Sequence, residues 1–233
     1  MSLVVAMRDD NGVVHMASDS MASTHFTKAD FDTCKITPTL DGDLIIGFVG
    51  SMHLSELQYY HYLPSAMGPS GDESMTKKLE ELDKIYKEQL EDIDFITDVK
   101  YEIMKRVKKI TGTPEGKQVS LGGNILIAFK DKMYLMWDDF AMVPIDNDWA
   151  AIGSGEYHAT SVMKIFEGYE GSDVIDILAT AIKIAGDSVL SVGGKIYYTN
   201  TEDCEVVEIS LEEIDREEEQ KIKEEVKKES DNE

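Results

Sequence analysis

The N-terminal stretch constrains the fold most, because it has the pattern of a buried β-hairpin starting at the second residue. An apolar run at Leu3–Met7 precedes a polar turn at Arg8–Gly12, and a second apolar run follows at Val13–Ala17. The turn ends in Asp-Asn-Gly, and such a turn between two apolar runs is typical of a hairpin. We therefore expect the chain to place its own N-terminus at the head of a buried strand.

Ser2 stands at the head of that strand and becomes the N-terminal residue if Met1 is removed. A serine hydroxyl is weakly nucleophilic until a base takes its proton. A free α-amino group, with a reference pKa of about 8, can act as that base near neutrality. One residue would then carry both nucleophile and base. Taken alone, Ser2 is equally an ordinary second residue, so residues elsewhere must decide.

The composition indicates an acidic protein with a real core. The chain has 233 residues, with 46 Asp and Glu against 23 Lys and Arg, a formal net charge of −23. Such a surface repels nucleic-acid backbones and anionic membranes, so neither is expected as a partner. The hydrophobic content of 42% is near the globular norm. The length allows one large domain or two small ones.

Cysteine usage and the absence of targeting signals favour the cytoplasm. Cys34 and Cys204 are far apart and form no CxxC motif, which is typical of a reducing compartment. The sequence shows neither a signal-peptide pattern nor an apolar segment long enough to span a bilayer. The five histidines lack zinc-like spacing and no glycine-rich phosphate loop occurs, so we expect no metal and no cofactor.

The order of elements predicts an α+β fold. Besides the hairpin, the patterns predict strands over 33–38, 44–50, 124–129, 133–137, 149–152, 195–199 and 204–209. They predict helices over 51–65, 156–166 and 173–186, the last capped by Ser172, and two more within 75–110. Strands joined by hairpins and helices that come in pairs indicate a four-layer αββα sandwich of two stacked antiparallel sheets. The charged segment 211–233 is expected to be a partly helical or disordered tail.

Five features resemble the proteasome β-subunit family of N-terminal nucleophile hydrolases, and in particular the peptidase subunit of the bacterial two-component ATP-dependent protease. The resemblance covers residues 2–209 and implies a single domain over 1–210. Each feature is weak alone, and their combination is specific. They are Ser2, Asp19, Lys35, Gly47, and the pair formed by Gly153-Ser154-Gly155 and Ile184-Ala185-Gly186-Asp187 with Ser191 nearby.

The resemblance implies roles for these residues. Ser2 is the nucleophile, Lys35 lies beside it and is held by Asp19, and the backbone N–H of Gly47 receives the oxyanion. A buried ammonium favours deprotonated neighbours, and an aspartate keeps it charged. Considered alone, Lys35 is equally well explained as a surface lysine on an edge strand.

The same resemblance implies that Ser154, Asp187 and Ser191 form a network around the terminal amine. Gly153-Ser154-Gly155 is equally typical of a tight turn before a helix. Two departures are visible: serine replaces the usual threonine, and the link from Asp187 to Gly194 is longer than in the family. Ser188 is therefore an alternative to Ser191.

Substrate contacts follow from the resemblance as well. Extended peptide would pair with the backbone at Ser23 and beside Gly47, as an added strand. Ala22, Thr37, Ile45 and Val49 would line the pocket for the residue before the cut. This predicts a small to medium apolar pocket without a fixed charge.

The implied function is that of a proteasome-like peptidase subunit in a homo-oligomeric ring, acting on unfolded polypeptide and served by a separate ATP-dependent unfoldase. Two alternatives stay open. One is an amidase or acyl transferase of the same fold that acts on small molecules. The other is a catalytically silent structural ring subunit.

Overall fold

The computed structural model of the protein describes residues 2–23, 28–30, 34–39, 43–50, 92–167, 173–203 and 205–210. The helix predicted over 51–65, the first of the two within 75–110, Cys204 and the tail 211–233 lie outside these residues. The extent of the single domain therefore stays a prediction.

The first sheet places the opening hairpin at its centre. Its five strands are antiparallel and lie in the order β10-β1-β2-β11-β12. Val4 lies opposite Ile152 on one side and opposite Ser18 on the other, so β1 is flanked by two strands. The bounds are β1 Leu3–Arg8, β2 Val14–Asp19, β10 Trp149–Gly153, β11 Ile196–Asn200 and β12 Val207–Ile209.

The second sheet is also antiparallel, with strand order β5-β6-β7-β8-β9. The glycine-containing strand β6 runs between β5 and β7, as its apolar sequence predicts. The bounds are β5 Ile36–Thr39, β6 Leu44–Gly50, β7 Gly123–Phe129, β8 Lys132–Met136 and β9 Met142–Ile145.

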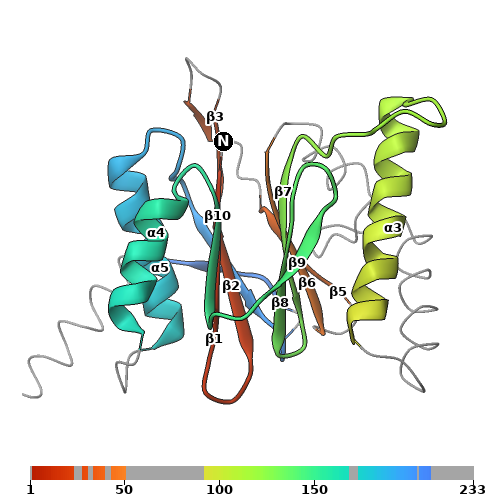
Figure 1. Ribbon diagram of the computed structural model, residues 1–233. Helices are drawn as coiled ribbons and strands as arrows, with labels where there is room; N and C mark the ends of the chain where they lie inside the picture. Colours follow the sequence, from red (N-terminus) through yellow and green to blue (C-terminus); the bar gives the residue numbers. More distant parts are fainter. Residues whose placement is uncertain are drawn as a thin grey trace, which may run out of the picture.

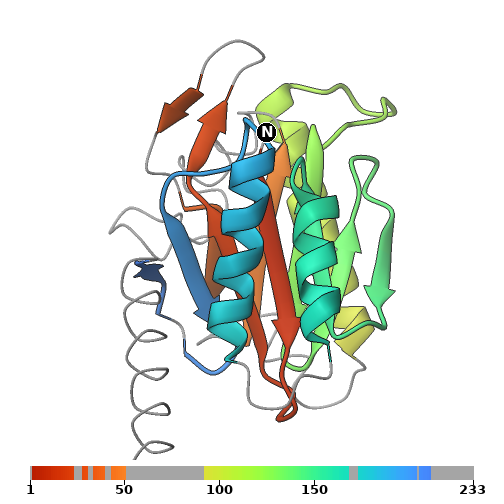
Figure 2. The same cartoon turned by 90° about the vertical axis from the view of Figure 1, so that its left-hand side faces the viewer.

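Helices cover the outer face of each sheet (Figures 1 and 2). Helices α4 (Glu156–Phe166) and α5 (Val174–Ser188) pack on the first sheet, and α3 (Asp92–Thr111) packs on the second. Three apolar clusters fill the two helix–sheet interfaces and the space between the sheets. The predicted α+β sandwich of four layers, αββα, is confirmed. Within the described ranges, no helix is both long and apolar enough to cross a membrane.

Three local features differ from the sequence-based expectation. The sequence patterns predict no strand for β3 (Met21–Ser23), β4 (Lys28–Asp30) or β9, yet β3 and β4 pair as a short hairpin and β9 adds to the second sheet. Strands of three residues are too short to show alternation, and Pro144 in β9 is tolerated because that strand lies at the sheet edge. The predicted cap of α5 is wrong: Asp173, not Ser172, is the N-cap and accepts a hydrogen bond from the N–H of Ile175 at 2.8 Å.

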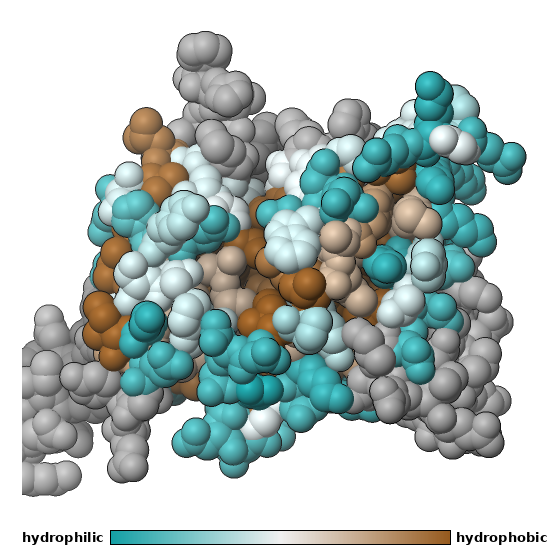
Figure 3. Space-filling model, viewed as in Figure 1, coloured by the Kyte–Doolittle hydropathy of each residue, from teal (hydrophilic) through white to brown (hydrophobic). Residues whose placement is uncertain are grey.

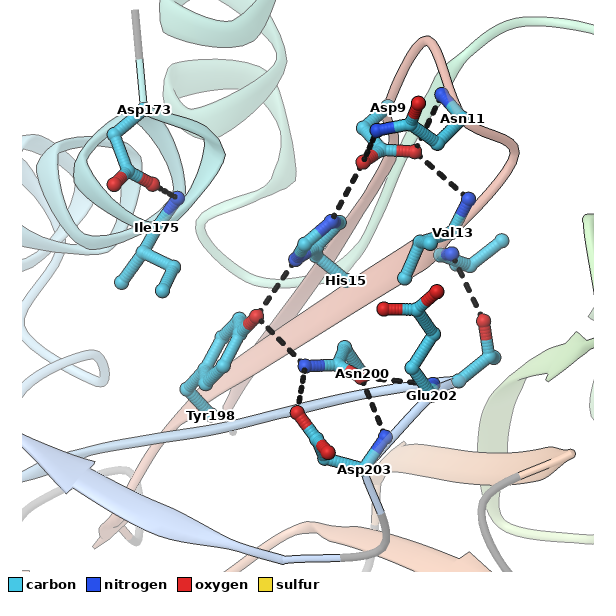
Figure 4. Close-up of polar contacts among 12 residues, drawn as sticks. Asp9, Asn11, Val13, His15, Asp173, Ile175, Tyr198, Asn200, Glu202 and Asp203 are labelled. Carbon is cyan, nitrogen blue, oxygen red and sulfur yellow. Dashed lines mark hydrogen bonds and ion pairs between the residues drawn. The ribbon is translucent and has the colours of Figure 1, made fainter.

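A polar cluster joins the β1–β2 turn to the end of β11 (Figure 4). The ring Nδ1 of His15 lies 2.6 Å from the hydroxyl of Tyr198, and its Nε2 lies 3.6 Å from Asp9. The Asn200 amide donates to the same hydroxyl at 3.2 Å and accepts the N–H groups of Glu202 and Asp203 at 2.8 Å each. This cluster stabilises the end of the first sheet that lies away from the head of β1 (Figure 1).

Candidate active site

The peptide group between Ser2 and Leu3 is held at both ends. The carbonyl oxygen of Ser2 accepts the N–H of Ser154 at 2.9 Å and lies 3.4 Å from the donating Ser154 hydroxyl. The N–H of Leu3 donates to Oδ1 of Asp19 at 2.8 Å. Ser2 itself is only 8% exposed. The residue that begins β1 is therefore fixed by groups from β2 and from the segment after β10.

Gly153 makes this arrangement possible. Its φ is +113°, and a Cβ at this position would lie 2.0 Å from the carbonyl oxygen of Ser2. Only glycine allows the backbone to approach so closely in this conformation. The first glycine of Gly153-Ser154-Gly155 is therefore required on steric grounds, which the sequence alone did not show.

Lys35 and Asp19 form a buried ion pair that joins the two sheets. Asp19 ends β2 and is fully buried, and Lys35 precedes β5 and is 4% exposed. The Lys35 ammonium donates to Oδ1 of Asp19 and to the carbonyl oxygen of Met21, the latter at 2.8 Å. Oδ2 of Asp19 accepts the N–H of Gly193 at 3.1 Å. Oδ1 therefore serves both the Lys35 ammonium and the Leu3 N–H.

Burial opposes charge on both members of this pair. It lowers the pKa of the Lys35 ammonium, and the Asp19 carboxylate acts in the opposite direction. Burial likewise raises the pKa of Asp19, opposed by Lys35 and by the N–H groups of Leu3 and Gly193. Both groups lose water, so each depends on the other and on backbone partners. A lysine with a lowered pKa in such a setting is typical of functional sites.

The Ser154 hydroxyl, which lies beside Ser2, contacts the hydroxyl of Ser191. The Oγ atoms of Ser154 and Ser191 are 2.7 Å apart, and Ser191 is 5% exposed. Ser191 belongs to the loop between α5 and β11, so the site gathers residues from β1, β2, β10 and this loop. The structure brings Ser191 to Ser154 as the resemblance implied. Whether the pair serves the terminal amine stays a prediction.

Two further predicted site residues, Asp187 and Gly47, lie outside the contacts described above. Asp187 is exposed in the last turn of α5. Gly47 lies opposite Ile36, and its missing Cβ would meet Val4 at 2.7 Å, which gives a packing reason for glycine. The N–H of the next residue, Phe48, donates to the backbone carbonyl oxygen of Lys35 at 3.1 Å, so the N–H of Gly47 points toward β7. The predicted roles of Asp187 and Gly47 stay predictions.

The predicted substrate residues divide into two groups. Thr37, Ile45 and Val49 are buried, and the last two belong to the apolar cluster between the sheets. Val49 also approaches Gly153, since a Cβ there would lie 3.2 Å from its Cγ1. Ala22 and Ser23 lie on β3.

The main groups that sequence reasoning missed are backbone atoms. The carbonyl oxygen of Met21 binds Lys35, and the N–H groups of Leu3 and Gly193 bind Asp19. Backbone groups leave no residue-type signal, although consecutive glycines at 193 and 194 indicate an unusual local conformation. No three or more His, Cys, Asp or Glu side chains in the described segments are grouped to hold a metal ion.

The structure therefore defines a four-layer αββα sandwich with a buried lysine–aspartate pair behind a strand-initial serine. The fold is similar to that of Thiobacillus denitrificans BPH, with a TM-score of 0.60 and 19% identity over 90% of this chain and 99% of that chain. It is also similar to Thiobacillus denitrificans BPH in complex with epoxomicin, with a TM-score of 0.58 and 18% identity over 89% of this chain and 99% of that chain.

Eukaryotic HslV from Trypanosoma brucei is a further structural neighbour, with a TM-score of 0.58 and 16% identity over 85% of this chain and 98% of that chain. No protein-family model matches the sequence, and no curated protein matches it. The likeness of structures establishes the fold, which is that of proteasome-like and HslV-like N-terminal nucleophile hydrolases. The fold resemblance predicted from the sequence is confirmed.

Proposed function

We propose that the chain is a proteasome-like peptidase subunit whose nucleophile is Ser2 after removal of Met1. The observation that carries this proposal is the Ser2–Leu3 peptide group held between Ser154 and Asp19, with Asp19 bound in turn to Lys35. A residue that must attack a substrate carbonyl needs a fixed position, and this clamp supplies one.

In the proposed reaction, the Ser2 hydroxyl attacks the carbonyl carbon of a peptide bond and its proton passes to the Ser2 amine. The intermediate collapses to an ester on Ser2, and the leaving amine takes the proton. Water then attacks the ester with the Ser2 amine as base, which releases the acid and restores the enzyme. The Lys35 ammonium is bound to the same Asp19 oxygen that holds the Leu3 N–H, and in the proposed mechanism its positive charge favours the unprotonated Ser2 amine that this requires.

The proposed substrate is unfolded polypeptide bound as an added strand along β3. With the apolar residues Ile45 and Val49 as proposed lining of the pocket, we expect a preference for a small to medium apolar residue before the cut. Peptide substrates that differ only at this residue test the point. Faster cleavage after arginine or aspartate than after alanine or valine would contradict it.

A homo-oligomeric ring in the cytoplasm, served by an ATP-dependent unfoldase, is part of the same proposal. Exposed apolar side chains on the outer helices support an assembly: Tyr157 is 79% and Ile165 is 65% exposed on α4, and Leu190 after α5 is 81% exposed. Apolar surface gathers along the α4–α5 side of the molecule in Figure 3. Such surface is typical of protein contacts.

The experiment that tests the function compares Ser2→Ala with Thr111→Ala, a control at the end of α3 whose hydroxyl contacts Val107, Lys108 and Thr113. Ser2→Ala is expected to abolish cleavage of fluorogenic peptides and to leave the oligomer intact, while Thr111→Ala keeps activity. Undiminished cleavage by Ser2→Ala would rule out the mechanism.

The two alternatives have their own discriminators. A monomer or dimer that hydrolyses small amides and spares peptides would favour the amidase. An intact ring without hydrolytic activity and with Met1 retained would favour the silent subunit, since a blocked amine cannot act as the base.

A further inference from the structure

We propose that Gly193 is a positioning residue for the Lys35 ammonium, acting through Asp19 and Met21 without touching Lys35. The inference rests on the proposed function, because it assigns a role within the same site.

The two residues that accept hydrogen bonds from the Lys35 ammonium are both hydrogen-bonded to Gly193. The N–H of Gly193 donates to Oδ2 of Asp19 at 3.1 Å, and its carbonyl oxygen accepts the N–H of Met21 at 3.0 Å. Asp19 and the Met21 carbonyl are in turn the two groups that bind the ammonium. Their separation and direction therefore depend on the backbone of Gly193.

The backbone of Gly193 has a conformation that favours glycine. Its φ is +145°, and a Cβ at this position would lie 3.0 Å from the Cε of Met21. An L-residue must change φ to relieve this strain. That change turns the N–H away from Asp19 or the carbonyl away from Met21.

The surrounding loop shows that Gly193 belongs to a fixed part of the site. The N–H of Lys195 donates to the Ser20 hydroxyl at 2.9 Å, so the loop is bonded to residues 19, 20 and 21 in succession. Two residues before Gly193, the Ser191 hydroxyl contacts that of Ser154. One loop thus connects the ion pair with the serine pair.

The test compares Gly193→Ala with Gly12→Ala in the full-length assembly. Gly12 lies in the β1–β2 turn at the far end, has φ +85° and donates one backbone hydrogen bond to Asp9 at 3.0 Å. A Cβ there would meet Asp131 only at ordinary contact distance, 3.5 Å. Gly12→Ala therefore also places alanine at a positive φ, but at a position outside the site.

We expect Gly193→Ala to lower kcat by about 10- to 100-fold with little change in KM, since a small misplacement of a catalytic group has effects of this size. The basic limb of the pH profile should move to lower pH by about one unit, because a poorly held ammonium loses its proton more easily. The titratable groups acting on Lys35 are Asp19 and the Cys34 thiol. Gly12→Ala should change neither quantity.

A second variant covers the case in which Gly193→Ala fails to assemble. Replacing Gly193 by glycolic acid turns its amide into an ester and removes only the N–H that binds Asp19, and the same replacement at Gly12 is the control. The ester at 193 alone should shift the basic limb. An unshifted profile in whichever Gly193 variant assembles, or equal shifts at both positions, overturns the inference while the wild type stays active. A wild type without peptidase activity overturns the proposed function, and the inference with it.

Discussion

Asp19 at the end of β2 and Lys35 before β5 form a buried ion pair that connects the two sheets directly behind the head of β1. Oδ1 of Asp19 also holds the Leu3 N–H. The pair therefore stabilises the sandwich and fixes the N-terminal strand at the same time. Stability and activity should respond together when it is changed.

Removing one partner of the pair should be costly. Lys35→Met leaves the Asp19 carboxylate fully buried without its cation, and we expect the free energy of unfolding to fall by about 3–5 kcal/mol. The double variant Asp19→Asn/Lys35→Met removes both charges and should be destabilised by less than the sum of the single changes. Denaturant unfolding of all three measures this. Strict additivity would contradict a coupled pair.

Gly153→Ala should disrupt the clamp on Ser2. The new Cβ would lie 2.0 Å from the Ser2 carbonyl oxygen, so the backbone must move and the bond from Ser154 is lost. We expect a loss of about 2–3 kcal/mol in unfolding free energy together with most of kcat/KM. Gly116→Ala, also at positive φ but with open space around it, should cost about 1 kcal/mol and keep activity. Similar effects of the two changes would argue against the clamp.

The polar cluster at the far end should affect stability alone. Asn200→Ala removes one of two partners of the Tyr198 hydroxyl and the acceptor of the N–H groups of Glu202 and Asp203, so we expect a loss of about 1–3 kcal/mol. Asn11→Ala, an exposed change in the neighbouring turn, should stay within about 0.5 kcal/mol. Thermal unfolding and peptide cleavage measured side by side check this. A selective loss of kcat/KM in Asn200→Ala would show that the cluster reaches the site.

Cys34 should resist alkylation in the folded protein. Burial raises the pKa of its thiol from 9.0 to about 11, opposed in part by a backbone hydrogen bond from Ile36 and by the charge of Lys35. The thiolate is the reactive form, and it is about a hundredfold scarcer at neutral pH after a shift of this size. Peptide mapping after iodoacetamide treatment should find Cys34 unmodified in folded protein and modified in urea. Rapid labelling of folded protein would contradict the burial.

The apolar patterns of the long strands were enough to predict the fold. The hairpin Leu3–Asp19 and strand β6 are apolar over several residues, and helices α4 and α5 follow the helical period, so their type and order were readable. The β3–β4 hairpin was not, because three-residue strands carry too little pattern.

The site was predictable only where side chains carry it. Asp19, Lys35, Ser154 and Ser191 were named from the sequence and are brought together in two contacting pairs. The contribution of Gly193 is made by backbone atoms, which any residue type possesses, so only the structure shows it. Asp187 follows the family order but is exposed, because α5 continues to Ser188 and carries it on the surface.

The central claim is that Ser2 is the N-terminal nucleophile, and locating a covalent adduct tests it most directly. The active assembly is treated with an irreversible acylating inhibitor, digested, and sequenced by tandem mass spectrometry. The account predicts a single inhibited site on a peptide that begins at Ser2. Full inhibition with the adduct on another residue, or an active protein whose N-terminal peptide retains Met1, would contradict it.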